Sequence, residues 1–172
     1  MPIGLIRHTR LAGAPGLCYG RSEVPLAASF DAEVAALLAQ LPWTPEVVWT
    51  SPAARCRRLA ERLGGLLRED ARLQELHFGA WEGRVWESFR GPESEAWALN
   101  PWALRPPGGE TGEELWRRVA EMRTVVAARG RAKTVVVTHA GVIRAWRAQA
   151  EGRTWAESLT LTVEFGALYW ST

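Results

Sequence analysis

The sequence predicts an α/β fold, a three-layer α/β/α sandwich with a mostly parallel central sheet. Short apolar runs at residues 2–6, 47–50 and 134–138 have the length of buried strands. Segments with helical periodicity separate these runs, and strands that alternate with helices favour a parallel sheet covered on both faces. A length of 172 residues suits a single domain, residues 1–172, with a sizeable core.

The first strand is expected at residues 2–6, and the glycines and prolines of residues 11–29 predict a loop after it. Asp31 can cap a helix that continues to about Leu41, with apolar side chains on one face. Residues 47–50 then form the second strand.

A second helix is predicted directly after this strand. Ser51 suits its N-cap and Pro52 its first helical position. Its apolar stripe is formed by Leu59, Leu63, Leu66 and Leu67. The pair Gly64-Gly65 can break the helix within that stripe.

The middle of the chain is less regular. Residues 73–76 suit a short strand or an extended lead-in to a turn, and the Trp-rich residues 85–104 contain a helix. A further helix begins at Glu110 or Thr111 and reaches about Arg129.

The third clear strand, at residues 134–138, is followed by a helix from Val142 to Ala150. Residues 165–170 are expected to form a terminal strand.

The bulk composition limits which binding partners and which cellular compartment we expect for the protein. The net charge of +2 is too small to indicate a nucleic-acid or membrane partner, and no apolar run approaches the roughly 18 residues of a membrane span. The chain begins without the basic region of a signal peptide. Cys18 and Cys56 are interpreted as free thiols of a reducing compartment, which predicts a cytoplasmic protein. No Cys/His spacing resembles a metal site, so we expect no metal and no cofactor; a homodimer stays open.

Two of the three histidines follow a strand, at the edge where ligands bind in an open α/β sheet. The first belongs to the pair Arg7-His8. Imidazole can attack phosphorus and form a phosphoramidate that water later cleaves, and the planar fork of arginine matches phosphate oxygens two at a time. The pair therefore indicates a phosphate pocket that contains a nucleophile; a histidine that merely caps a turn is the alternative.

The second of these histidines, His139, follows the strand at 134–138 and opens a helix. Free N–H groups at a helix N-terminus favour an anion, and a protonated His139 would add charge. Arg55, near the start of the second helix, is placed to aim its guanidinium at the same strand ends. Its neighbours Arg57 and Arg58 are turned by roughly 100° per residue and are expected to face solvent.

A leaving-group oxygen departs poorly unless it is protonated. Glu75 is the first candidate for the proton donor, since a carboxyl group beside phosphate oxygens can hold a proton at neutral pH. Glu82 on the same turn is the alternative, and His77 between them is interpreted as a structural or rim residue.

Taken in order, five segments resemble the histidine phosphatase superfamily, which includes phosphoglycerate mutases, from Leu5 to about Ala148. They are Arg7-His8, Ser51-Pro52-x-x-Arg55, Glu75 ahead of Phe78-Gly79-x-Trp81-Glu82-Gly83, Pro107-Gly108-Gly109-Glu110, and Thr138-His139-Ala140-Gly141-Val142-Ile143-Arg144. The resemblance implies a phosphoglycerate mutase-like fold and a small-molecule phosphate ester as substrate.

By this resemblance His8 is the nucleophile that becomes phosphorylated. Arg7, Arg55 and His139 bind the phosphoryl group. Glu75 is the general acid and then the base that activates water.

A loop near the substrate is also expected, and the candidates for binding the rest of the substrate are Tyr19, Gly20, Arg21 and Ala140. The chain departs from the family where Gly-Glu usually follows Arg-His, because Thr9-Arg10 stands there. This departure leaves the substrate preference open.

Glu75 and His139 lie only 64 positions apart, whereas mutases carry a longer insertion there. A mutase must keep water from its phosphohistidine, so a short, open chain favours a phosphatase. The segments around Tyr19 and Trp81 look like the alpha-ribazole-5′-phosphate phosphatase branch, which acts in cobalamin assembly. The alternatives are a phosphoglycerate mutase-type phosphotransferase, a broad-specificity small-molecule phosphatase and, of another class, an inactive phosphate-binding module.

Trp86, Trp97 and Trp102 fall in the segment that would cover the pocket. One or more of these rings can stack on a flat base such as a benzimidazole. The alternative is that they only pack the core or a lid.

Overall fold

The computed structural model describes residues 2–13, 15–128 and 132–171. Within them a five-stranded sheet has the strand order β3-β2-β4-β1-β5. The strands are β1 (Ile3–Arg7), β2 (Val47–Thr50), β3 (Leu66–Glu69), β4 (Thr134–Thr138) and β5 (Leu168–Ser171). The first four run parallel, and β5 pairs antiparallel with β1. The predicted α/β fold with a mostly parallel sheet is confirmed.

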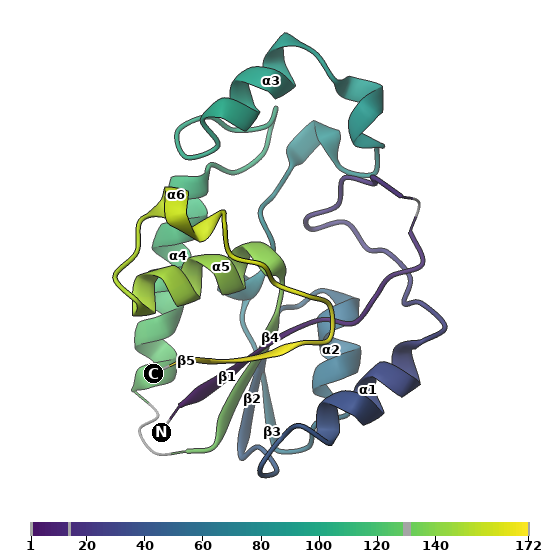
Figure 1. Ribbon diagram of the computed structural model, residues 1–172, viewed down its shortest axis with the longest axis vertical. Helices are drawn as coiled ribbons and strands as arrows, with labels where there is room; N and C mark the ends of the chain where they lie inside the picture. Colours follow the sequence, from purple (N-terminus) through teal and green to yellow (C-terminus); the bar gives the residue numbers. More distant parts are fainter. Residues whose placement is uncertain (1, 14, 129–131, 172) are drawn as a thin grey trace.

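Helices cover both faces of this sheet (Figure 1). They are α1 (Phe30–Leu38), α2 (Ala54–Ala60), α3 (Pro92–Leu99), α4 (Gly112–Ala127), α5 (Ala140–Ala150) and α6 (Trp155–Ser158), with short 3-10 helices at Ala71–Leu73, Gly79–Trp81 and Trp86–Phe89. Successive strand residues point to opposite faces. Leu5 and Val136 therefore pack with α4 and α5, whereas Ile6 and Val137 pack with α1 and α2.

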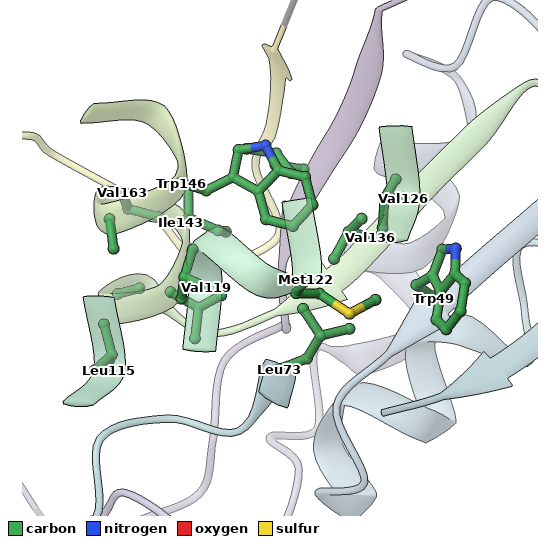
Figure 2. Close-up of a cluster of buried hydrophobic side chains, with 14 of the residues drawn as sticks. Trp49, Leu73, Leu115, Val119, Met122, Val126, Val136, Ile143, Trp146 and Val163 are labelled. Carbon is green, nitrogen blue, oxygen red and sulfur yellow. The ribbon is translucent and has the colours of Figure 1, made fainter. Parts of the chain in front are cut away.

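The cluster under α4 and α5 is the larger core. Figure 2 shows side chains of α4, α5 and β4 pointing toward one another there, among them Met122, Trp146 and Val136. Met122 is fully buried and Trp146 is 1% exposed. Each such side chain contributes about 1.5–3 kcal/mol through burial, so this cluster holds the strands and α5 in a fixed relation.

Residues 112–127 confirm the predicted helix start. Thr111 is the N-cap, its hydroxyl accepts from Glu114 N–H, and the Glu114 carboxylate accepts from Thr111 N–H. This reciprocal capping box satisfies two N–H groups of the first turn. The predicted end at Arg129 lies outside the described residues.

The break allowed at Gly64-Gly65 is confirmed, whereas two other parts of the prediction for the second helix are wrong. Leu66 and Leu67 belong to β3, because Gly64 and Gly65 take φ values of +77° and +80° that end the helical path. The N-cap is Ala53, so the helix starts after the expected Ser51-Pro52. The Ser51 hydroxyl accepts from Ala53 N–H at 3.3 Å and also makes the contact described below.

Smaller differences affect other boundaries. The segment at 73–76 is an extended lead-in after a 3-10 helix and not a strand, and the helix expected within 85–104 is the short α3 preceded by a 3-10 helix. The terminal strand runs from Leu168 to Ser171. None of the described helices is long and apolar enough to cross a membrane.

The carboxyl ends of β1, β2 and β4 lie side by side, and the chain continues from them into His8, Ser51 and His139. In Figure 1, α3 lies beyond these ends, at the top of the view. The fold thus places the ligand-binding edge of an α/β sheet beneath a helical cover.

Candidate active site

His8 and His139 meet where β1 and β4 end. Their ring centroids are 5.3 Å apart, and each side chain is only 1% exposed. The parallel ladder continues one step past β1, since His8 N–H donates to Thr138 O at 3.1 Å. Regular strand pairing therefore brings together two residues separated by most of the chain.

The hydrogen bond of the His8 ring determines which nitrogen can react. Its Nδ1 lies 2.8 Å from the carbonyl oxygen of Thr9. A carbonyl can only accept, so Nδ1 carries the proton and Nε2 keeps a free lone pair. Burial, together with the charges of Arg55 and Arg7, lowers the pKa of His8 to about 3 despite the bond to Thr9. His8 is thus a neutral imidazole, as a nucleophile requires.

Arg7 is held beside His8 by two contacts from the region before β5. Its Nη1 donates to Val163 O at 2.6 Å, and its Cζ lies 3.5 Å from the ring centroid of Phe165. The Phe165 ring also lies 5.5 Å from the His8 ring. Tyr19 comes within hydrogen-bonding reach of the same guanidinium.

Arg55, at the second position of α2, is 1% exposed and points back to the strand ends. Its Nη2 donates to Gly20 O at 2.5 Å and its Nη1 to Ser22 O at 2.8 Å. The Tyr19 ring lies 5.4 Å from its Cζ. Arg55 therefore ties the predicted substrate loop to the cationic cluster. Its neighbours at 57 and 58 are exposed, as expected.

Gly20 is required by the closeness of this loop to its surroundings. A Cβ at Gly20 would overlap the carbonyl oxygen of Leu76 and the Glu82 carboxylate. Any larger residue would push the loop from Arg55.

His139 is the N-cap of α5 and contacts Ser51 and Arg55. Its Nε2 is 2.8 Å from Ser51 Oγ, and its Nδ1 is 3.4 Å from Arg55 Nη2. A guanidinium can only donate, so Nδ1 accepts and Nε2–H donates to the serine. Burial, with the nearby His8 and Arg55, lowers the pKa of His139 well below its ordinary value. The His139 side chain is therefore a neutral imidazole in the protein alone, without the added charge that a protonated ring would bring.

Glu75 and Glu82, the two candidates for the proton donor, have different surroundings. Glu75 Oε2 accepts from Gly141 N–H at 3.0 Å, in the first turn of α5, and Oε1 accepts from its neighbour Leu76. Glu75 and Gly141 also line a cavity of about 300 Å³. Glu75 thus stands between α5, the helix that His139 caps, and a space that can hold a leaving group.

The Glu82 carboxylate is occupied by the substrate loop. It accepts from the N–H groups of Arg21, Ser22 and Phe78 and from the Ser22 hydroxyl. Burial raises its pKa, but these hydrogen bonds outweigh burial and leave the pKa below its ordinary value. Glu82 holds the loop, so the geometry favours Glu75 as the donor. The side chain of His77 is 38% exposed and 4.0 Å from Glu82, a rim position.

The cavity beside Glu75 is almost entirely apolar. It is lined by Glu75, Leu76, Phe78, Trp97, Ala98, Pro101, Leu115, Gly141, Arg144, Trp155, Ser158 and Leu159. Of the three tryptophans singled out from the sequence, only Trp97 is in this lining. Trp86 stacks behind it, with centroids 5.9 Å apart, and Trp102 packs on Trp155 at 5.6 Å.

Two of the predicted substrate-binding residues, and Arg10, have further contacts that the structure defines. Arg21 directs Nη2 to Glu110, 3.4 Å away. Ala140, the first residue of α5, is 9% exposed and belongs to the core cluster. Arg10, which replaces the family's usual acidic residue, has a 64% exposed side chain 3.6 Å from Glu33. Its charge is therefore met outside the site.

Several site residues were not found from the sequence. Phe165 was interpreted only as part of a strand, and Trp155 carried no signal beyond its ring. Ser51 was assigned to capping a helix rather than to His139. His8 itself is 1% exposed.

Comparison with known proteins places this geometry in context. The model of the histidine phosphatase superfamily (branch 1) matches residues 3–171. Among solved structures, TTHB049 from Thermus thermophilus is 31% identical, with a TM-score of 0.75 over 99% of this chain and 92% of that one. No match was found among curated proteins.

Two further structures are similar in fold. The alpha-ribazole phosphatase from Shigella flexneri is 22% identical, with a TM-score of 0.89 over 98% of this chain and 88% of that one. The mycobacterial glucosyl-3-phosphoglycerate phosphatase is 21% identical, with a TM-score of 0.82 over the same shares.

Proposed function

Because the chain belongs to the histidine phosphatase superfamily and is a phosphatase enzyme, we propose that it hydrolyses alpha-ribazole 5′-phosphate through a phosphohistidine at His8, without a metal ion. The choice of substrate rests on the apolar, tryptophan-lined cavity next to Glu75. Its volume of about 300 Å³ suits one flat aromatic base, and its lining offers rings for stacking.

In the first step the lone pair of His8 Nε2 attacks phosphorus, and the bond from phosphorus to the ester oxygen breaks. Glu75 gives its proton to that oxygen, which leaves as an alcohol. The guanidinium groups of Arg7 and Arg55 meet the charge on the transferring phosphoryl oxygens.

In the second step water attacks the phosphohistidine and the P–N bond breaks. The Glu75 carboxylate takes the proton of the water, and inorganic phosphate leaves. The neutral imidazole of His8 is restored with its proton still on Nδ1, where Thr9 O holds it.

The neutral His139 has a defined part in this scheme. Ser51 Oγ can accept from Nε2–H or donate to Nε2, because a hydroxyl does both. When it donates, the proton of His139 sits on Nδ1, which can then donate to a phosphoryl oxygen, provided that the Arg55 N–H that faces Nδ1 in the protein alone turns to the phosphoryl group as well. Phosphate binding then needs no imidazolium.

The lining of the cavity also favours this substrate over that of a phosphoglycerate mutase. The substrate of a phosphoglycerate mutase carries a second charged group that the enzyme must bind. Among the described residues that line the cavity, Arg144 is the one with a cationic side chain, and its Nε already donates to Leu161 O. We further propose a cytoplasmic location, on the basis of Cys18 and Cys56, which are buried free thiols.

The proposal is tested with a panel of phosphate esters that includes alpha-ribazole 5′-phosphate and 3-phosphoglycerate, assayed in excess chelator. We expect preferential release of phosphate from the former, and a rapid quench to find acid-labile label on His8. His8→Ala should abolish both, and Arg57→Ala, at an exposed position, serves as the matched control. Label on another residue, or turnover by His8→Ala, would contradict the mechanism; release from every ester at equal efficiency would contradict the substrate.

A further inference from the structure

The segment that carries Glu75 lacks the partners of a regular strand. Residues 74–77 lie between two 3-10 helices and outside the sheet. Their position therefore depends on side chains that reach them from elsewhere in the fold. This matters because a proton donor must stand within hydrogen-bonding reach of the leaving oxygen.

Arg118 of α4 supplies those contacts. Its Nη1 donates to Arg72 O at 2.7 Å and Gln74 O at 2.6 Å, and its Nη2 donates to Glu75 O at 3.1 Å. Three main-chain carbonyls around the acid thus share one guanidinium. The Arg118 side chain is 13% exposed, so water replaces these bonds poorly.

Glu110 holds that guanidinium from the other side. Its Oε1 accepts from Arg118 Nε at 2.7 Å and its Oε2 from Nη2 at 2.9 Å, a bidentate pair. With these bonds all five N–H donors of Arg118 are used. Glu110 Oε2 also accepts from His77 N–H at 3.3 Å. The pair therefore brackets the chain on both sides of Glu75.

We infer that Arg118, oriented by Glu110, is the positioning residue that keeps Glu75 in place as proton donor. This rests on the proposed phosphatase reaction but not on the identity of its substrate. It also gives the Pro107-Gly108-Gly109-Glu110 segment a role, because Glu110 ends it and Thr111 caps the helix that bears Arg118.

The chemistry provides a readout that simple loss of stability does not. Dinitrophenolate leaves without a proton, whereas an alkoxide needs one. A displaced Glu75 therefore slows the transfer of the phosphoryl group to His8 from an alkyl phosphate such as glycerol phosphate, and spares that transfer from dinitrophenyl phosphate. The second step uses Glu75 for both esters, so the comparison is made with kcat/KM, which reports the first step alone. Partial unfolding slows both equally.

The test compares kcat/KM for these two esters in Arg118→Lys, which keeps the charge and loses the fork. We expect the alkyl ester to slow about 10- to 100-fold, as for a displacement of about 1 Å, with little change for dinitrophenyl phosphate. Glu110→Gln should show the same ranking and remains informative if the lysine variant folds poorly. Arg117→Lys, at the exposed neighbouring position, is the control.

A double variant completes the test. Because Arg118 acts through Glu75, Glu75→Gln combined with Arg118→Lys should be no slower on the alkyl ester than Glu75→Gln alone. Equal slowing of both esters, no slowing of either, or additive losses in the double variant would overturn the inference. A wild-type protein that releases phosphate from neither ester would instead refute the proposed function.

Discussion

Gly141 offers a substitution that moves Glu75 without altering it. The residue lies in the first turn of α5 without a positive φ, so its backbone accepts alanine. A Cβ there would stand well under 3.0 Å from Glu75 Oε1 and 3.2 Å from its Cδ. The carboxylate must therefore shift on the order of 1 Å, and a displacement of that size costs roughly 100-fold in rate.

The stability of Gly141→Ala is expected to change little. Alanine is favoured over glycine in a helix by about 1 kcal/mol, and losing the hydrogen bond from Gly141 N–H to Glu75 costs about the same. The obstacle is also the end of a flexible side chain rather than backbone. Activity and stability should thus separate in this variant.

The assay measures kcat/KM, which reports phosphoryl transfer to His8, for glycerol phosphate and dinitrophenyl phosphate together with Tm. We expect roughly a 100-fold loss with the alkyl ester, a much smaller loss with the activated ester, and a Tm close to that of the wild type. Gly91→Ala is the control, because a Cβ there meets nothing within 4 Å. An unchanged kcat/KM for the alkyl ester would refute the assignment of Glu75 as the proton donor.

Two more predictions follow from the histidines and the cavity. Burial lowers the pKa of His8 to about 3 and that of His139 well below its usual value, so the unfolded chain binds more protons below about pH 6.5. The unfolding free energy should fall as pH drops below that point, by up to about 1.4 kcal/mol per unit for each histidine, and denaturant titrations should find a shallower slope for His8→Asn. Trp97→Ala should raise KM for alpha-ribazole 5′-phosphate roughly 10-fold, the value of a lost base stack, whereas Trp102→Ala, outside the lining, should leave KM unchanged. Unchanged KM in Trp97→Ala would end the stacking hypothesis.

The parallel strands at residues 2–6, 47–50 and 134–138 were predictable because each is a short apolar run that neighbouring residues alone reveal. Runs such as residues 134–138 are buried on both faces, and no helix pattern competes with them. The strand β3 was not, since Leu66 and Leu67 also fit the stripe of the preceding helix. The positive φ of the two glycines before them decides whether the helix continues, and the sequence Gly-Gly does not specify the φ values that the pair takes.

In the site, too, some features were predictable from the sequence and others depend on tertiary packing. His8 and His139 were found because strand ends converge in this fold, so position along the chain implies position in space. The ion pair between Arg21 and Glu110 could not be predicted, because the two residues lie 89 positions apart in the sequence. The tautomers of both histidines likewise depend on a carbonyl, a hydroxyl and a guanidinium that tertiary packing supplies.

The N-terminus of α5 links the two halves of the reaction. His139 is its N-cap, and Gly141, two residues later, donates its N–H to Glu75. The helix thus sets the spacing between a phosphate ligand and the proton donor, while Arg118 holds the donor's main chain from α4. Because α4 and α5 pack on each other through the larger core, the distance from acid to phosphate is a property of that core. Core substitutions between these helices should therefore alter the preference between alkyl and activated esters before they unfold the protein.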